Sequence, residues 1–204
     1  MPTATPPPLD PDTISELLFL ARVGETLELK STLSHLSKSL STTPSTLLLS
    51  SIDPDTGNST LHMASANGHT ETIHTLLTLS TPPAHNSTTT HPNPSSTSPP
   101  IPPSPLINLS NSSLNTPLHW AALNGHLDAV KMLSDAGADA QLVNRAGRDA
   151  RGEAEMGGKM EVVEWLGVRC EGQGEEEGLD GGLEEGGEVG KGMEGEGEEG
   201  REGD

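Results

Sequence analysis

The most constraining feature of this chain is a segment that recurs along it. Residues 116–138 read TPLHWAALNGHLDAVKMLSDAGA, and residues 59–69 carry a shorter version of the same pattern, STLHMASANGH. A degenerate version follows at 144–166, in which Gly158 lies 33 residues after Gly125. A period of about 33 residues is typical of repeat proteins, in which each unit packs only against its neighbours and the stack shares one continuous core. We therefore expect a solenoid rather than a globule with a single central core.

Within one copy, the residues predict two helices joined by a tight turn. The first helix begins at Thr116-Pro117, since proline is tolerated in the first turn of a helix, where its missing N–H has no partner to lose. Gly125 ends that helix, because glycine adopts the left-handed conformation without a Cβ penalty. Apolar residues at helical spacing from Leu127 to Leu133 then mark the buried face of the second helix. The predicted fold class is an all-α repeat solenoid of helix-turn-helix units.

The pattern predicts four units within one repeat domain over residues 11–168. The first and last units depart most from the pattern, as expected of units that cap a stack and keep one side in solvent. Four units exceed the three that are usually needed for a stable stack. The units are expected at about 11–50, 53–80, 108–140 and 143–168. In the first of them, the outer helix is expected to bury Leu27, Leu29, Leu33 and Leu36.

Three stretches are predicted to lie outside the packed repeats. Residues 1–10 are rich in proline, residues 81–107 form a Pro/Ser/Thr-rich insertion between the second and third units, and residues 171–204 form a Gly/Glu tail. Such compositions bury too little apolar surface to offset the entropy of ordering the chain, so we expect all three to be disordered. The tail holds 14 acidic residues against two basic ones.

The charge and the cysteine content narrow the classes of partner and compartment. A formal net charge of −19 repels nucleic acid and anionic lipid, and it attracts basic proteins. The single cysteine, Cys170, permits no disulfide within the chain, which fits a reducing compartment. The first residues lack the pattern of a signal peptide, and no apolar run approaches the length that a bilayer requires. We therefore expect a monomer in the cytoplasm and nucleus, with no direct contact to nucleic acid or membrane.

The repeated segments resemble the consensus of the ankyrin-repeat family, which has the same period and the same Thr-Pro-Leu-His and Gly-His signatures. His62 and His119 occupy one position of the repeat, which a metal or catalytic site would also explain. The resemblance implies instead that this histidine joins hydrogen bonds between neighbouring hairpin turns, and neither residue is accompanied by a cluster with zinc spacing. We expect no metal, no cofactor and no enzymatic activity. The positions with structural roles in the repeat are His62, Gly68, His119, Gly125 and Gly158.

The resemblance also implies a protein-binding role, since ankyrin stacks bind partners on a concave face made of hairpin turns and inner helices. Trp120 stands where the consensus has a core leucine. It therefore either fills a gap between inner helices or anchors a partner, as aromatic residues do at binding hot spots. The residues expected on the concave face are Arg22, Asp55, Asn58, Ala66, Asn67, Asn115, Trp120, Leu123, Asn124, Arg148 and Met156.

Within that family, the order of features is most similar to the small fungal ankyrin-repeat chaperones of a small-subunit ribosomal protein. The degenerate fourth unit carries this likeness through Asn144-Arg145, Asp149-Ala150 and Glu153-Ala154-Glu155, together with a spacer between the central units and an acidic tail. The long insertion departs from that pattern. The resemblance implies a dedicated chaperone or escort of a basic small-subunit ribosomal protein in ribosome biogenesis. The alternative is a general ankyrin adaptor or regulator, of the transcription-factor or kinase inhibitor type, with a non-ribosomal partner.

Overall fold

The computed structural model describes residues 9–81 and 104–171, and this part of the chain is helical. Its only extended pairing is a single antiparallel bridge between Ile52 and Ser59. The predicted all-α repeat fold is therefore confirmed. Within the described residues, no helix has both the length and the apolar character needed to cross a bilayer. The helices are α1 Pro11–Val23, α2 Thr26–Ser39, α3 Pro44–Ser50, α4 Thr60–Ala66, α5 Thr70–Ser80, α6 Pro117–Asn124, α7 Leu127–Asp135, α8 Ala150–Met156 and α9 Met160–Glu171.

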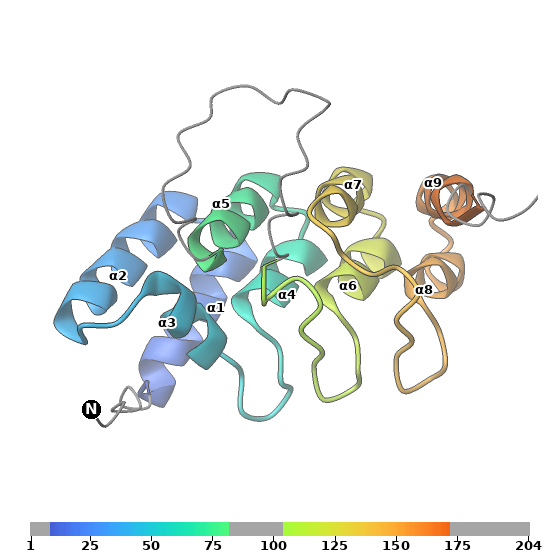
Figure 1. Cartoon of the computed structure of the whole chain (residues 1–204). Helices are drawn as coiled ribbons and strands as arrows, with labels where there is room; N and C mark the ends of the chain where they lie inside the picture. The colour runs from blue at the N-terminus through green and yellow to red at the C-terminus, as the bar shows by residue number, and fades with distance from the viewer. Residues whose placement is uncertain (1–8, 82–103, 172–204) are drawn as a thin grey trace, which may run out of the picture.

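The helices form two rows, as Figure 1 shows. The inner row is α1, α4, α6 and α8, in which each helix packs against the next, and the outer row is α2, α5, α7 and α9. The loops that precede α4, α6 and α8 project as hairpin turns on the side away from the outer row (Figure 1). We call the surface made by the inner helices and these turns the inner face. It corresponds to the concave face expected from the sequence.

One apolar core runs through the stack. Inner helices contribute small side chains, so that neighbouring helices approach closely, and outer helices contribute larger ones that cover them. The fully buried alanines of the inner row are Ala21, Ala64, Ala121, Ala122, Ala150 and Ala154. The larger side chains that cover them include Leu29, Leu33, Ile73, Leu76, Val130, Leu133, Val162 and Leu166.

The predicted burial is wrong for one residue of the expected core. Leu27, which was predicted to be buried with the other leucines of the first outer helix, is 81% exposed. Helix α2 begins at Thr26, whose hydroxyl is buried and lies 2.7 Å from that of Thr72. Leu27 follows it in the first turn and faces solvent. Leu29 and Leu33 are fully buried, and Leu36 is partly buried against the core, as expected.

Helix α3 is a further element that the repeat pattern does not contain. Thr43 caps it by accepting a hydrogen bond from the backbone N–H of Thr46 at 3.2 Å, and Pro44 occupies its first turn. Leu47 and Leu48 are buried, and the helix packs against α2 and α5. The first unit therefore contains three helices rather than two.

The edges of the predicted disordered stretches also change. Leu106 and Ile107, placed in the insertion 81–107, are 0% and 2% exposed and belong to the core. The Ser104 hydroxyl forms a hydrogen bond with that of Ser80, so the two ends of the insertion meet beside α5. Asp10 caps α1 and α9 continues to Glu171, so both boundaries extend beyond 11–168. The remainder of the predicted disordered stretches, at 1–8, 82–103 and 172–204, lies outside the described residues.

Candidate partner-binding face

The inner face includes three hairpin turns that are stabilised in the same way. In each turn, one side-chain oxygen accepts two backbone N–H groups, which is the geometry that makes aspartate and asparagine favourable in turns. The oxygen belongs to Asp53, Asn111 or Asn144, and its distances to the donors are 2.9–3.1 Å. The backbone N–H of Thr56 holds the pKa of Asp53 below its ordinary value, because this hydrogen bond favours the ionised carboxylate. The turns are therefore fixed by their own side chains.

Neighbouring turns are also bonded to one another. The Asn111 side-chain amide donates to Oδ1 of Asn58, and the Asn144 amide donates to Oδ1 of Asn115, both at 2.8 Å. Backbone bonds of 2.9 Å from Ser112 to Thr56 and from Arg145 to Ser113 run parallel to them. Asn58 and Asn115 were predicted to face a partner. Their side-chain oxygens are engaged in holding the next turn, so these two residues align the row.

His62 and His119 join each inner helix to the following turn. Nδ1 of each ring accepts the backbone N–H of the helix N-cap residue, Ser59 or Thr116, at 3.1 Å. The Nε2–H groups donate to the carbonyls of Asn115 and Arg148, at 2.9 and 3.2 Å. Both rings are 1% exposed. Their hydrogen bonds run between successive repeats, which is the structural role that the family resemblance implies.

Burial sets the charge of these histidines. Loss of solvation lowers the pKa of His62 to about 4, and the same cause lowers the pKa of His119. Both imidazoles are therefore neutral near pH 7, as the acceptor role of Nδ1 requires. Within the described residues, no group of three or more His, Cys, Asp or Glu side chains is arranged to hold a metal ion.

A groove of about 390 Å³, which we call the inner groove, crosses the inner face between α1, α4 and α6. Its walls bring together residues from three successive repeats, and six of them were predicted for the concave face. Those six are Arg22, Asn58, Ala66, Asn67, Trp120 and Asn124, and the remaining two lining residues are His62 and Met63. Met63 was missed, although it occupies in LHMA the place that Trp120 occupies in LHWA.

Trp120 forms one wall of this groove. It is half-buried, and its Nε1–H is enclosed without an acceptor among the described residues. Of the two interpretations left open by the sequence, the structure shows the ring half-buried in the wall of the groove, where a partner can reach it. Asn124 lies one helical turn further on, and its amide donates to the carbonyl of Ala66 at 2.9 Å. The end of α6 is thereby tied to the end of α4.

The other predicted residues lie along the inner face outside the groove. Asp55 is exposed at the first hairpin turn, and Met156 is 68% exposed at the end of α8. Leu123 is half-buried where α6 closely approaches Gly157. Arg148 forms an ion pair of 2.9 Å with Glu153, which is buried. The structure therefore gathers the predicted set on one face, but only part of it surrounds a common hollow.

Leu114 is a second residue that the sequence did not single out. Its φ of 60° is left-handed, at the turn position where the other two hairpins have Gly57 and Gly147, with φ of 72° and 73°. A left-handed residue with a Cβ costs roughly 1–2 kcal/mol. The side chain is nevertheless apolar and 47% exposed. Aligning the three turns would have revealed this leucine in the place of a glycine.

Comparison with known proteins agrees with this geometry. A family model described as ankyrin repeats (three copies) matches residues 44–144. The chain belongs to the ankyrin-repeat family. Among solved structures, it is similar to the chaperone Yar1 in the crystal structure of the yeast ribosomal protein Rps3 in complex with its chaperone Yar1. That match has a TM-score of 0.60 and 31% sequence identity, and it covers 79% of this chain and 95% of the other.

Two further relatives share the repeats over shorter stretches. A probable E3 ubiquitin-protein ligase, XBOS33 of Oryza sativa subsp. japonica, is 47% identical over 53 residues, which are 26% of this chain and 10% of that protein. The Notch-regulated ankyrin repeat-containing protein B of Danio rerio is 35% identical over 74 residues, which are 32% of this chain and 67% of that protein. The chain thus spans only a tenth of the rice protein.

Proposed function

We propose that this chain is a dedicated chaperone or escort of a basic small-subunit ribosomal protein, which it binds through the groove on its inner face. The observation that carries the proposal is the similarity to Yar1, which extends over 95% of that chain and comes from a complex with a ribosomal protein. The ankyrin repeats support a protein-binding role without catalysis. Such a partner is made in the cytoplasm and assembled in the nucleus, so the chain would act in both.

The charge of the groove differs from that of the rest of the chain, which suggests different roles in binding for the two. Arg22 is the only ionised residue among those lining the groove, so the groove itself is not acidic. Its asparagine amides and the indole of Trp120 favour specific polar and stacking contacts. The net charge of −19 lies elsewhere, with 14 acidic residues in 171–204. Charge of this kind attracts a basic protein over roughly 8–10 Å at physiological salt and raises the rate of encounter.

Because the groove has no acidic residue in its lining, it is also compatible with the second candidate function, a general adaptor or regulator with a non-ribosomal partner. A groove with one arginine and several amides would accept a neutral or acidic segment of a regulatory partner as well. An adaptor of that kind would bind with little dependence on salt. A chaperone of a basic protein would associate more slowly as salt screens the attraction. The salt dependence of association therefore separates the two.

A protection assay tests the chaperone role. The basic ribosomal protein that corresponds to Rps3 is diluted from high to low salt, and its aggregation is followed by light scattering. We expect an equimolar amount of this chain to keep the protein soluble. Polyglutamate of equal total charge serves as the control, because it supplies the charge without the groove. Equal protection by polyglutamate, or no protection by the chain, would contradict the proposal.

A further inference from the structure

A second hollow lies among the outer helices, between α7 and α9. Its volume is about 620 Å³, against about 390 Å³ for the groove on the inner face. We call it the outer groove. None of its lining residues was predicted to contact a partner. They are Leu127, Glu161, Glu164, Trp165, Val168 and Arg169.

The floor of the outer groove is apolar. Leu127 and Trp165 pack against the core with one side and remain partly open on the other. Val168, one turn beyond Glu164 on α9, is 75% exposed. The exposed Val168 side chain and the partly exposed indole of Trp165 together offer apolar surface to a bound segment. Burying such surface stabilises a complex by about 25 cal/mol per Å².

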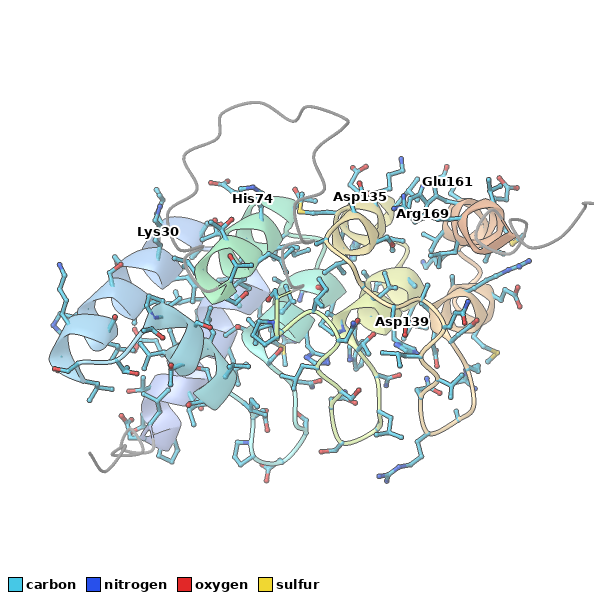
Figure 2. The ribbon with its side chains drawn as sticks, in the orientation of Figure 1. Lys30, His74, Asp135, Asp139, Glu161 and Arg169 are labelled. Carbon is cyan, nitrogen blue, oxygen red and sulfur yellow. The ribbon has the colours of Figure 1, made fainter. Side chains whose placement is uncertain are left out.

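Arg169 forms one wall of the outer groove, and its charge is already paired within the chain. The guanidinium of Arg169 lies 5.1 Å from the centroid of the Trp165 ring, which is the geometry of a cation–π contact. The same group forms an ion pair of 2.9 Å with Asp135 at the end of α7. Figure 2 shows Asp135 on α7 and Arg169 on the facing helix α9. Because Asp135 compensates the charge of Arg169, this wall adds no net positive charge to the groove.

The remaining rim is acidic. Glu161 and Glu164 are exposed carboxylates on α9, one turn apart. A further hollow, of about 500 Å³, continues across the start of α7, shares Leu127 and Glu161 with the outer groove, and adds Asp128. The two hollows are thus lined by three carboxylates, those of Asp128, Glu161 and Glu164, and by one guanidinium, that of Arg169, which is paired with Asp135. An acidic peptide or a nucleic acid backbone would be repelled, whereas lysine and arginine would be attracted.

We propose that the outer groove is a second docking site, and that its occupant is a short segment of a partner protein with aliphatic residues flanked by lysine or arginine. The aliphatic residue lies against Leu127, Trp165 and Val168, and the flanking cations face Glu161 and Glu164. The site is separate from the groove on the inner face, so it stands whether or not a ribosomal protein binds there.

The two tryptophans allow a direct test on the full chain, since Trp120 lines the inner groove and Trp165 lines the outer one. Their indole N–H signals in a two-dimensional NMR spectrum report on each groove separately. The probe is a short synthetic peptide of leucines flanked by lysines. We expect it to shift the Trp165 signal and to leave the Trp120 signal in place. A shift of Trp120 alone, or of neither, would overturn the proposal.

Matched variants separate recognition from general attraction. The double variant Glu161→Lys, Glu164→Lys should lower the affinity for the peptide by roughly tenfold at low salt, since two attractive charges become repulsive. Glu25→Lys with Glu28→Lys makes the same charge change on exposed residues at the start of α2, and should leave the affinity within about twofold. Equal weakening by both pairs would mean that only net charge matters and would refute the site.

Changing the peptide keeps the test valid even where a variant folds poorly. Serine in place of leucine should reduce the Trp165 shift, because the apolar floor then gains nothing. An unchanged shift would contradict the assigned binding mode. A Trp165 signal that moves with protein concentration in the absence of peptide would instead identify a second copy of this chain as the occupant, against the proposal.

Discussion

The imidazole of His126 packs against Gly68 of the preceding repeat. A Cβ on Gly68 would lie 2.6 Å from Nδ1 of that ring, while its Nε2–H donates to the carbonyl of Ala66 at 3.1 Å. Gly24 and His69 form the same pair one repeat earlier, with a Cβ distance of 2.8 Å and a hydrogen bond of 2.9 Å to Arg22. The Gly-His signature therefore joins consecutive repeats, in addition to ending a helix.

Gly68→Ala should destabilise the stack by roughly 2–4 kcal/mol. Its φ of 71° strains any residue with a Cβ, and the added methyl group also collides with His126. Gly147→Ala is the matched control, since its φ is 73° but its Cβ would meet no atom of the described residues within 4 Å. It should cost only about 1–2 kcal/mol. Urea denaturation measures both, and equal losses would show that the contact with His126 contributes nothing.

Leu114→Gly should leave stability unchanged or raise it by up to about 1 kcal/mol. Removing the Cβ relieves the left-handed strain at φ 60°, and the greater freedom of glycine in the unfolded chain offsets part of this gain. Because the side chain is 47% exposed, little packing is lost. Thermal denaturation provides the comparison with the unaltered protein. A loss above about 1 kcal/mol would mean that the leucine supports the turn by contacts.

Stability should fall as the pH is lowered from about 6.5 to 4. In the folded state burial depresses the pKa of His62 to about 4, so within this window the unfolded chain binds a proton that the folded chain does not. Above pH 6.5 no stability is lost through this histidine, and the loss grows to roughly 3 kcal/mol as the pH reaches 4. His119 acts in the same direction. Urea denaturation across this range, with His62→Gln as the comparison, should show a smaller slope in the variant. Equal slopes would contradict the assigned burial effect.

Truncation after Glu171 should slow association with a basic ribosomal protein and flatten its salt dependence. The removed residues carry 13 acidic and two basic side chains, and they follow the end of α9. Their charge acts before contact, so the on-rate should change more than the off-rate. The free energy of unfolding should stay the same. Stopped-flow kinetics at several salt concentrations measures the effect, and an unchanged on-rate at low salt would contradict it.

The repeats were predictable because their determinants are local. A histidine three residues after its N-cap, as His62 follows Ser59, and a glycine just beyond the same helix, as Gly68 is, can both be recognised within one unit. Their contacts with Asn115 and His126 of the next unit then recur along the stack with the pattern. Helix α3 also had a local signal, since Thr43-Pro44 is a typical helix start. It was missed because the repeat pattern has no third helix, and because the burial of Leu47 depends on packing between separate helices.

Other features depend on how the repeats sit together. Leu106 ends a long polar stretch, and its burial follows from the return of the chain to α5 at Ser104. The inner groove joins Arg22 to Trp120 across two repeat boundaries, so the sequence could list these residues but could not show that they share one hollow. The outer groove arises from the space between α7 and α9, for which no single residue is a signal.

In the proposed complex, the inner groove holds the basic ribosomal protein and sets how slowly it dissociates. The most direct measurement is the kinetics of binding between that protein and the double variant Asn67→Ala, Trp120→Leu, which alters two groove residues. The control variant is Lys30→Ala, His74→Ala, which changes exposed residues of the outer helices α2 and α5 (Figure 2). We expect the groove variant to dissociate at least about tenfold faster with a similar on-rate, and the control variant to bind like the unaltered chain. No binding by the unaltered chain at low salt, or unchanged dissociation of the groove variant, would contradict the proposal.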